Sequence, residues 1–243
     1  MRVLHGEIVE LEKIDLEGGK LVCGFPGPGL VGSIAAKYLA GYLKMEEVAY
    51  LRSRLLPPIS MFYEGRLQHP FRVHIKRARK LAVLIAETLV PSIAYYDVAS
   101  SIVNWAESKG VYMIVCLEGV PASGERGERL AYGAAEDVDE LEKRGIKPLN
   151  AGVVAGISGA IMNECLVRRV KGVCLFVQAD VSKPDVEAAA ALLQALNSLL
   201  GLKVKTDILL ANANQVVEKL QGIVEHLRTV KESEDKLRLA LYA

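Results

Sequence analysis

The sequence lacks a paired-cysteine motif, an excess of either charge and a hydrophobic run long enough to cross a membrane. The four cysteines have no C-x-x-C spacing, and three of them lie in apolar, strand-like runs. This pattern favours small buried thiols over disulfides or a metal site, and a reducing cytoplasm is the compartment that fits them. The four are Cys23, Cys116, Cys165 and Cys174.

The balance of charge argues against nucleic acid as a partner. Thirty basic and twenty-nine acidic residues give a formal charge of +1, so no overall field attracts phosphate backbones or anionic lipids. The local basic run at residues 72–80 alternates cationic and apolar side chains, which predicts a half-buried strand that ends in a charged turn. Because no aromatic side chains interleave the run for base stacking, we expect no nucleic-acid partner.

Targeting and membrane-spanning patterns are also missing. The first residues, Met1–Glu7, reach polar and acidic side chains too soon for a signal peptide. The charge-free stretch 188–202 is shorter than the ~20 residues of a membrane span. The four histidines show no metal-ligand spacing with each other. We therefore expect a soluble cytoplasmic protein with no membrane partner and no metal.

The chain does contain short apolar runs that alternate with longer helical patterns, as in a sheet flanked by helices. A hydrophobic content of 51% in 243 residues is enough to bury a large core. Buried, mostly parallel strands are predicted at residues 20–25, 80–86, 111–117 and 172–178. Helices are predicted at residues 30–43, 95–108, 135–144, 158–168 and 184–200.

Residues 46–77 differ, because prolines and a glycine interrupt short strand-like pieces. This segment predicts an antiparallel insertion or an edge extension of the sheet. The expected fold class is α/β, with a single domain over residues 1–230, a mixed, mostly parallel sheet flanked by helices, a C-terminal helix, and a flexible tail over residues 231–243.

The predicted C-terminal helix, Asp207–Val230, repeats apolar residues in steps of four and three, the spacing of a three-heptad seam. Two interpretations are open: the seam packs on the sheet or a helix of its own subunit, or it forms a contact between subunits. The seam residues are Leu209, Ala213, Val216, Leu220, Ile223, Leu227 and Val230.

Two glycine-rich loops, residues 24–33 and 151–160, each precede a predicted helix. Such loops can hold phosphate with backbone amides. Two prolines remove donors from the first loop, however, and its spacing matches neither G-x-G-x-x-G nor a P-loop. The alternative is a tight strand-to-helix crossing in which Gly29 and Gly32 let backbones approach. Ser158 in the second loop lacks the G-x-S-x-G context of a nucleophile.

Acidic residues follow three of the apolar strands, and ligands of open α/β folds bind at the carboxyl ends of such strands. Convergent carboxylates can hold a metal or act as general acid and base. The other interpretation is that they are solvated or cap the next helix. The first interpretation leads to a small-molecule enzyme, a ligase or phosphorylase relative. The possible crevice comprises Gly27, Gly29, Glu87, Glu118 and Asp180.

Three segments together resemble the proteasome assembly chaperone 2 family in its archaeal branch. They are Gly24–Gly32, Gly152–Gly159 followed by Asn163 and Glu164, and Gly172–Leu175. The resemblance implies a core similar in topology to nucleoside phosphorylases, used as a protein-binding scaffold without ATP or another cofactor. It also implies a homo-oligomer, for which we expect a trimer or tetramer, with the α-subunits of the proteasome core particle as partner.

The last residues of the sequence fit this resemblance. Leu241, Tyr242 and Ala243 form the hydrophobic–tyrosine–any residue (HbYX) motif through which such proteins are expected to engage the proteasome α-ring, and Leu239 extends the apolar contact. The preceding stem, residues 231–236, carries five charges in six positions, which favours a solvated tail. An assembly chaperone, an activator and a structural oligomer without a proteasome partner all stay open.

Overall fold

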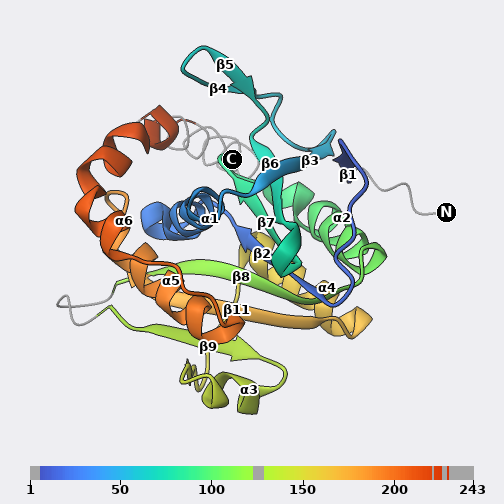
Figure 1. The fold of residues 1–243 in the computed structure, drawn as a ribbon, viewed down its shortest axis with the longest axis vertical. Helices are drawn as coiled ribbons and strands as arrows, with labels where there is room; N and C mark the ends of the chain where they lie inside the picture. Colours follow the sequence, from blue (N-terminus) through green and yellow to red (C-terminus); the bar gives the residue numbers. More distant parts are fainter. Residues whose placement is uncertain (1–5, 123–128, 221, 226–228, 230–243) are drawn as a thin grey trace, which may run out of the picture.

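The computed structural model describes residues 6–122, 129–220, 222–225 and 229. They form a large mixed sheet with helices on both faces (Figure 1). The strands are β1 (Gly6–Glu10), β2 (Gly19–Gly24), β3 (Glu46–Ser53), β4 (Met61–Tyr63), β5 (Arg66–Gln68), β6 (Phe71–Lys76), β7 (Leu81–Ala86), β8 (Val111–Pro121), β9 (Ala131–Ala135), β10 (Lys147–Pro148) and β11 (Lys171–Ala179). The helices are α1 (Val31–Tyr42), α2 (Tyr95–Ser108), α3 (Val138–Lys143), α4 (Gly156–Arg168), α5 (Val186–Leu200) and α6 (Asp207–Ala211), with single 3-10 turns η1 (Pro28–Leu30), η2 (Arg77–Arg79) and η3 (Ser92–Ala94).

The main sheet has the strand order β1-β3-β6-β7-β2-β8-β11-β9-β10. Its centre, β7-β2-β8-β11, is parallel, whereas β1, β3 and β6 pair in antiparallel fashion on one side. On the other side, β9 is antiparallel to β11. The four strands predicted from continuous apolar runs are these four central strands, which are covered on both faces. The predicted mixed, mostly parallel α/β fold is therefore confirmed.

The interrupted segment, residues 46–77, supplies both an edge extension and a separate arm. Strands β3 and β6 lengthen the sheet, and β4 and β5 form a small two-stranded hairpin that projects from the body (Figure 1). The basic run folds as β6 followed by the turn η2, as predicted. The strand is more buried than expected because Arg72 is also enclosed, with 4% of its surface exposed.

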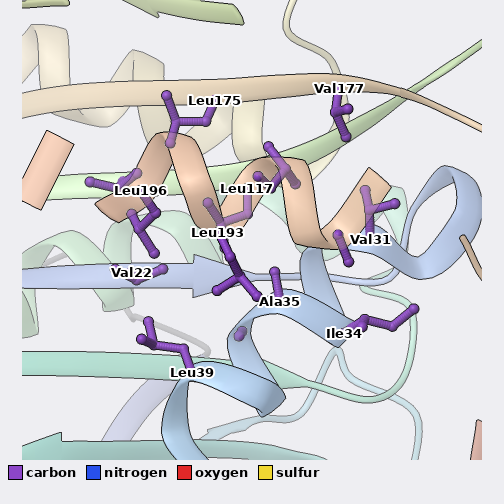
Figure 2. Close-up of a cluster of buried hydrophobic side chains, with 14 of the residues drawn as sticks. Val22, Val31, Ile34, Ala35, Leu39, Leu117, Leu175, Val177, Leu193 and Leu196 are labelled. Atoms are coloured by element: carbon purple, nitrogen blue, oxygen red, sulfur yellow. The ribbon is translucent and has the colours of Figure 1, made fainter. Parts of the chain in front are cut away.

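Alternate residues of the central strands point into two separate cores. Val22 belongs to the core under α1 and α5, whereas its neighbours Leu21 and Cys23 belong to the core under α2 and α4. Figure 2 shows the first of these cores, with Ala35 of α1 and Leu193 of α5 among its side chains. This alternation follows from the two-residue repeat of a strand, and it fixes which helices cover which face.

The C-terminal helical segment packs on its own subunit. It begins as α6, is interrupted at Asn212 and continues over residues 213–220 and 222–225. The Asn212 side chain donates to the Ile208 carbonyl at 2.8 Å, a local competition that accounts for the interruption. Of the seam, Leu209, Leu220 and Ile223 are buried in the α1–α5 core, and Ala213 and Val216 are partly buried against it. The described seam is thus intramolecular, and Leu227 and Val230 lie outside the described residues.

One helix prediction was wrong at its start. Residues from Ala135 onward were expected to be helical, but β9 ends at Ala135 and α3 begins only at Val138. The segment before α3 is held by pairing with β11, in which Ala135 lies opposite Val173. Long-range pairing has therefore overridden the helix preference of alanine.

All four cysteines are buried and free of disulfides, as predicted. Three of them lie side by side, with Cys116 of β8 in register with Cys23 of β2 and Cys174 of β11. Burial raises the pKa of Cys174 well above its usual value and that of Cys165 to about 12. These thiols are therefore protonated and unreactive at neutral pH.

Both borders of the main sheet carry features that oppose further strand pairing. On β1, Glu7 is ion-paired with Arg52 and Glu10 with Lys109, the latter at 2.7 Å. The opposite border, β10, is only Lys147–Pro148. Charged side chains, short length and proline are the usual means of blocking an edge strand.

Two glycines of α1 allow a direct test of its packing. A Cβ at Gly32 would lie 2.4 Å from the Leu117 carbonyl oxygen, whereas one at Gly41 would meet nothing within 4 Å. We expect Gly32→Ala to lower the free energy of unfolding by about 1–3 kcal/mol through overpacking. Gly41→Ala should raise it by about 0.5–1 kcal/mol, because alanine favours the helix. Urea unfolding of both variants measures the difference, and equal effects would contradict the described crossing.

Candidate functional site

The first glycine-rich loop forms a crowded crossing between β2 and α1. A Cβ at Gly24 would lie 2.3 Å from the Gly32 carbonyl oxygen. Gly29 has a φ of 62°, and a Cβ there would lie within about 3 Å of Ala179 and of the Asp180 carbonyl oxygen. These contacts explain the glycines by close packing, the second of the two interpretations of this loop.

Glu118 lies near this loop, in the last part of β8. Its Oε2 is 3.5 Å from the position that a Cβ on Gly27 would occupy. The hydroxyl of Ser158, in the first turn of α4, donates a hydrogen bond to Glu118 Oε1. Burial raises the pKa of the Glu118 carboxyl to about 7, although the bond from Ser158 acts in the opposite direction. Glu118 is therefore a carboxyl group that titrates near neutral pH.

Glu87, directly after β7, is engaged in a buried ion-pair network. Its Oε1 is 2.6 Å from Lys37 Nζ, and its Oε2 is 2.5 Å from Arg72 Nη2. Burial alone would raise the pKa of Glu87, but the two cations outweigh it and lower the pKa. Arg72 also contacts Glu47 at 3.4 Å and donates to the His69 carbonyl at 2.7 Å. Glu87 is thus a charged link between α1, β6 and β7.

Asp180 follows β11 and shapes the turn that leads to α5. Its Oδ1 accepts hydrogen bonds from the backbone and the hydroxyl of Ser182. Its amide donates to Asp185, which also caps α5 by accepting from the Ala188 amide and pairs with Arg129 at 2.6 Å. Asp185 in turn donates its own amide to the Gly29 carbonyl. The acid at this strand end therefore organises a loop against η1.

The structure brings some of the predicted crevice residues together. Glu118 lies by Gly27, and the backbone of Asp180 lies by Gly29, while Glu87 is held by Lys37 and Arg72. Within the described ranges, no group of three or more His, Cys, Asp or Glu side chains is arranged to hold a metal ion. Over the same ranges, no helix has the length and apolarity needed to span a bilayer.

Sequence reasoning missed the partners of these acids. Lys37 and Arg72 are 50 and 15 residues from Glu87, and Ser158 is 40 residues from Glu118. Only tertiary structure joins such pairs, so no local pattern signals them. Asp185 is different, because an aspartate just before an apolar helical run is a recognisable N-cap.

The predicted docking residues Leu239, Leu241, Tyr242 and Ala243 lie outside the described residues. The helical segment earlier in the chain is described at residues 213–220, 222–225 and 229. Within it, Lys219 Nζ lies 5.8 Å from the centre of the Tyr63 ring, so this segment passes beside the β4–β5 hairpin (Figure 1).

Known proteins share this architecture. The model of the PAC2 family matches residues 21–224. PbaA of Pyrococcus furiosus, an archaeal homolog of proteasome-assembly chaperone, superposes with a TM-score of 0.83 at 29% identity over 92% of this chain and 99% of its own. A protein of unknown function from Thermoplasma acidophilum gives 0.82 at 33% identity over 90% of each chain.

A third structure, PbaB of Pyrococcus furiosus, is described as an archaeal proteasome activator. It has a TM-score of 0.77 at 22% identity and covers 91% of this chain and 99% of its own, a likeness that concerns the fold. The family match spans most of the sequence and includes both glycine-rich loops, β7, β8 and β11, and β2 from Leu21 onward. This chain therefore belongs to the PAC2 family.

Proposed function

We propose that this protein is an ATP-independent proteasome assembly chaperone or activator that docks on the α-ring of the core particle through Leu241, Tyr242 and Ala243. The observation that carries the proposal is the likeness to PbaA over nearly the full length of both chains. The HbYX ending of this chain supplies a matching means of attachment.

In this mechanism the tail is the ligand and the folded body presents it. The Ala243 carboxylate pairs with a lysine between adjacent α-subunits, Tyr242 places its phenol against the pocket wall, and Leu241 fills the apolar part, with Leu239 extending the contact. A stem with five charges in six positions gives the tail the solubility to reach such a pocket. No nucleotide or other cofactor takes part.

The geometry of the crevice supports a scaffold role for the body. The charge of Glu87 is balanced by two cations, Asp180 shapes a turn, and Gly24, Gly29 and Gly32 of the first glycine-rich loop are closely packed. A ligase or phosphorylase needs several groups that converge on a substrate. Here Glu87 and Asp180 are engaged in the fold, and the described contacts of Glu118 are with Ser158 and the first glycine-rich loop. This arrangement supports a protein-binding role.

Several copies acting together would bind better than one. A single tail makes a small contact, but tails on one homo-oligomer raise each other's effective concentration, so avidity can exceed single-tail affinity by ~10²-fold or more. A trimer or tetramer of this chain would provide that multivalency for the ring of α-subunits.

The test is capture of purified proteasome core particle by immobilised protein. We expect removal of residues 241–243, or Tyr242→Ala, to abolish capture, because the motif supplies the contact. Tyr112→Ala is a matched control: Tyr112 is a partly exposed tyrosine of β8, distant in sequence from the tail. Circular dichroism and light scattering should show unchanged folding and mass for the tail variants. Capture of core particle at the wild-type level by the shortened chain would contradict the proposal.

A further inference from the structure

We propose that the β4–β5 hairpin reversibly holds the C-terminus of its own chain, with residues 237–242 added to the hairpin as a third strand. This contact, the latch, rests on the proposed function, because it describes how the docking motif is held before a proteasome binds it. In such a contact an extended segment pairs its backbone with the exposed edge of a sheet, and alternate side chains supply the specificity.

The hairpin is a small sheet with an exposed apolar side. Its turn residues Glu64 and Gly65 have φ of 50° and 76°, the left-handed conformations of a tight two-residue turn. Phe62 of β4 lies directly opposite Leu67 of β5, and these residues are 75% and 81% exposed. Within the described residues this sheet has two strands, so one edge of each is open to pairing. Two strands alone are marginally stable in water, and a third strand with an apolar side stabilises them.

The other side of the hairpin faces the protein. Met61 is partly buried against the α1–α5 core, and the ring centre of Tyr63 is 5.8 Å from Lys219 Nζ. Because side chains alternate along a strand, Phe62 points away from this side. The helical segment that leads toward the C-terminus therefore passes beside the inner side of the hairpin (Figure 1). The apolar pair of Phe62 and Leu67 lies on the outer side.

The C-terminal sequence has the pattern that an open strand edge accepts. Residues 237–242 read Leu-Arg-Leu-Ala-Leu-Tyr, with leucine at every second position, which is the period of a half-buried strand. On a third strand the three leucines would share one side of the sheet with Phe62 and Leu67. The chain is also long enough. Thr229 is ten residues after Lys219, and residues 230–243, which lie outside the described residues, span up to about 45 Å when extended.

Other exposed apolar residues do not lie at an open strand edge. Val153 and Val181 are in loops, and Val167 is in α4. The borders of the main sheet are strand edges, but the charges on β1 and the shortness of β10 oppose pairing there. The hairpin combines open edges, exposed apolar side chains and a position beside the segment that leads to the C-terminus. These three features make the chain's own C-terminus its occupant.

The latch competes with docking. Leu241 and the backbone around it cannot pair with the hairpin and enter a pocket of the α-ring at the same time. The apparent affinity of the motif for the ring is therefore reduced in proportion to the fraction of C-termini that are free. A proteasome that engages several copies at once overcomes this reduction through avidity, whereas a weak single-site partner does not.

Hydrogen–deuterium exchange of the full-length protein tests the latch. We expect the amides of residues 237–242 to exchange about 10-fold or more slowly than in a free peptide of the same sequence. Leu67→Glu should remove this protection, because a charge would replace the apolar contact. Leu237→Ser should remove it from the other side of the contact while the HbYX motif stays intact. Val167→Glu is the matched control, since Val167 is 82% exposed on α4, and it should keep the protection.

Capture of purified core particle gives a second measurement. Leu67→Glu should bind the particle about 3-fold or more tightly than the wild type, because more C-termini are free. Val167→Glu should bind as the wild type does. Unchanged thermal unfolding shows that each variant is folded.

Four results would overturn the latch: exchange of residues 237–242 at the free-peptide rate in the wild type, protection that persists in Leu67→Glu, protection that declines on dilution, or weaker capture by Leu67→Glu. Decline on dilution would mean that another copy holds the C-terminus, and weaker capture would make the hairpin a contact to the core particle. The proposed function is read separately. A protected C-terminus in a protein that never captures core particle refutes the proposed function alone, and capture with an unprotected C-terminus refutes the latch alone.

Discussion

Replacement of Arg72 by methionine is expected to lower the free energy of unfolding by about 3 kcal/mol, the low end of the range for breaking a buried ion pair. Arg72 and Glu87 are 4% exposed each, and their charged atoms are 2.5 Å apart. Without the guanidinium, Glu87 keeps only Lys37, whose side chain is half exposed. Urea unfolding at neutral pH measures the loss.

Arg52→Met is the matched control. Arg52 pairs with Glu7 on the neighbouring part of the sheet, but both side chains are mostly exposed, so we expect a change below about 1 kcal/mol. The double variant Arg72→Met with Glu87→Gln should recover part of the loss, because it no longer buries an incompletely paired charge. Additive losses in the double variant would show that the two residues do not act as a pair.

The same network predicts an acid response. The pKa of Glu87 in the folded chain is lower than its usual value of 4.5, so its contribution to stability is present above pH 4.5 and is lost as the pH falls through the lower folded-state pKa. In the Arg72→Met variant this acid-dependent loss should shrink, because one of the two cations that lower the pKa is gone.

The second large effect is expected at Glu118. Its folded-state pKa of about 7 exceeds the usual 4.5, so the folded chain holds the proton more tightly than the unfolded chain. The contribution of Glu118 to the free energy of unfolding is full below pH 4.5 and is lost as the pH rises through 7. The loss amounts to roughly 3 kcal/mol. Glu118→Gln keeps the size and can still accept from Ser158. The variant should therefore match the wild type near pH 4.5 and exceed its stability by up to roughly 3 kcal/mol at pH 8.

Unfolding free energies measured between pH 4.5 and 8 test this prediction. The exposed Glu187 of α5 provides the control, since Glu187→Gln makes the same chemical change away from the loop. A Glu118→Gln profile that runs parallel to the wild type would show that folding does not shift the pKa of this carboxyl and would contradict the prediction.

The central part of the fold was predictable because the strands buried on both faces are continuous apolar runs, as at 111–117. The edge extension was also accessible, from the prolines and glycine that interrupt residues 46–77. The start of α3 was not predictable, because Ala135 is held in a strand by pairing with Val173, 38 residues later in the chain. Local preference carries no information about such pairing.

At the candidate site, the sequence located the acids but not their tasks. The sequence did not predict the buried ion pair of Glu87, because its partner Arg72 is of a residue type that usually lies on the surface. The raised pKa of Glu118 was not predictable either, because the residues beside it come from α4 and the first glycine-rich loop. The proposed docking motif is the reverse case, because it is a short linear pattern that can be proposed from the sequence without a fold to define it.

The blocked borders of the main sheet have a consequence for the protein at high concentration. A strand of another copy would have to pair with β1, whose border carries charged side chains, or with β10, which has two residues and ends at Pro148. Amyloid fibres grow by adding strands through backbone hydrogen bonds at exposed edges. The features of both borders of the main sheet oppose this addition. A concentrated solution of this protein is therefore not expected to form fibrils through the edges of its main sheet.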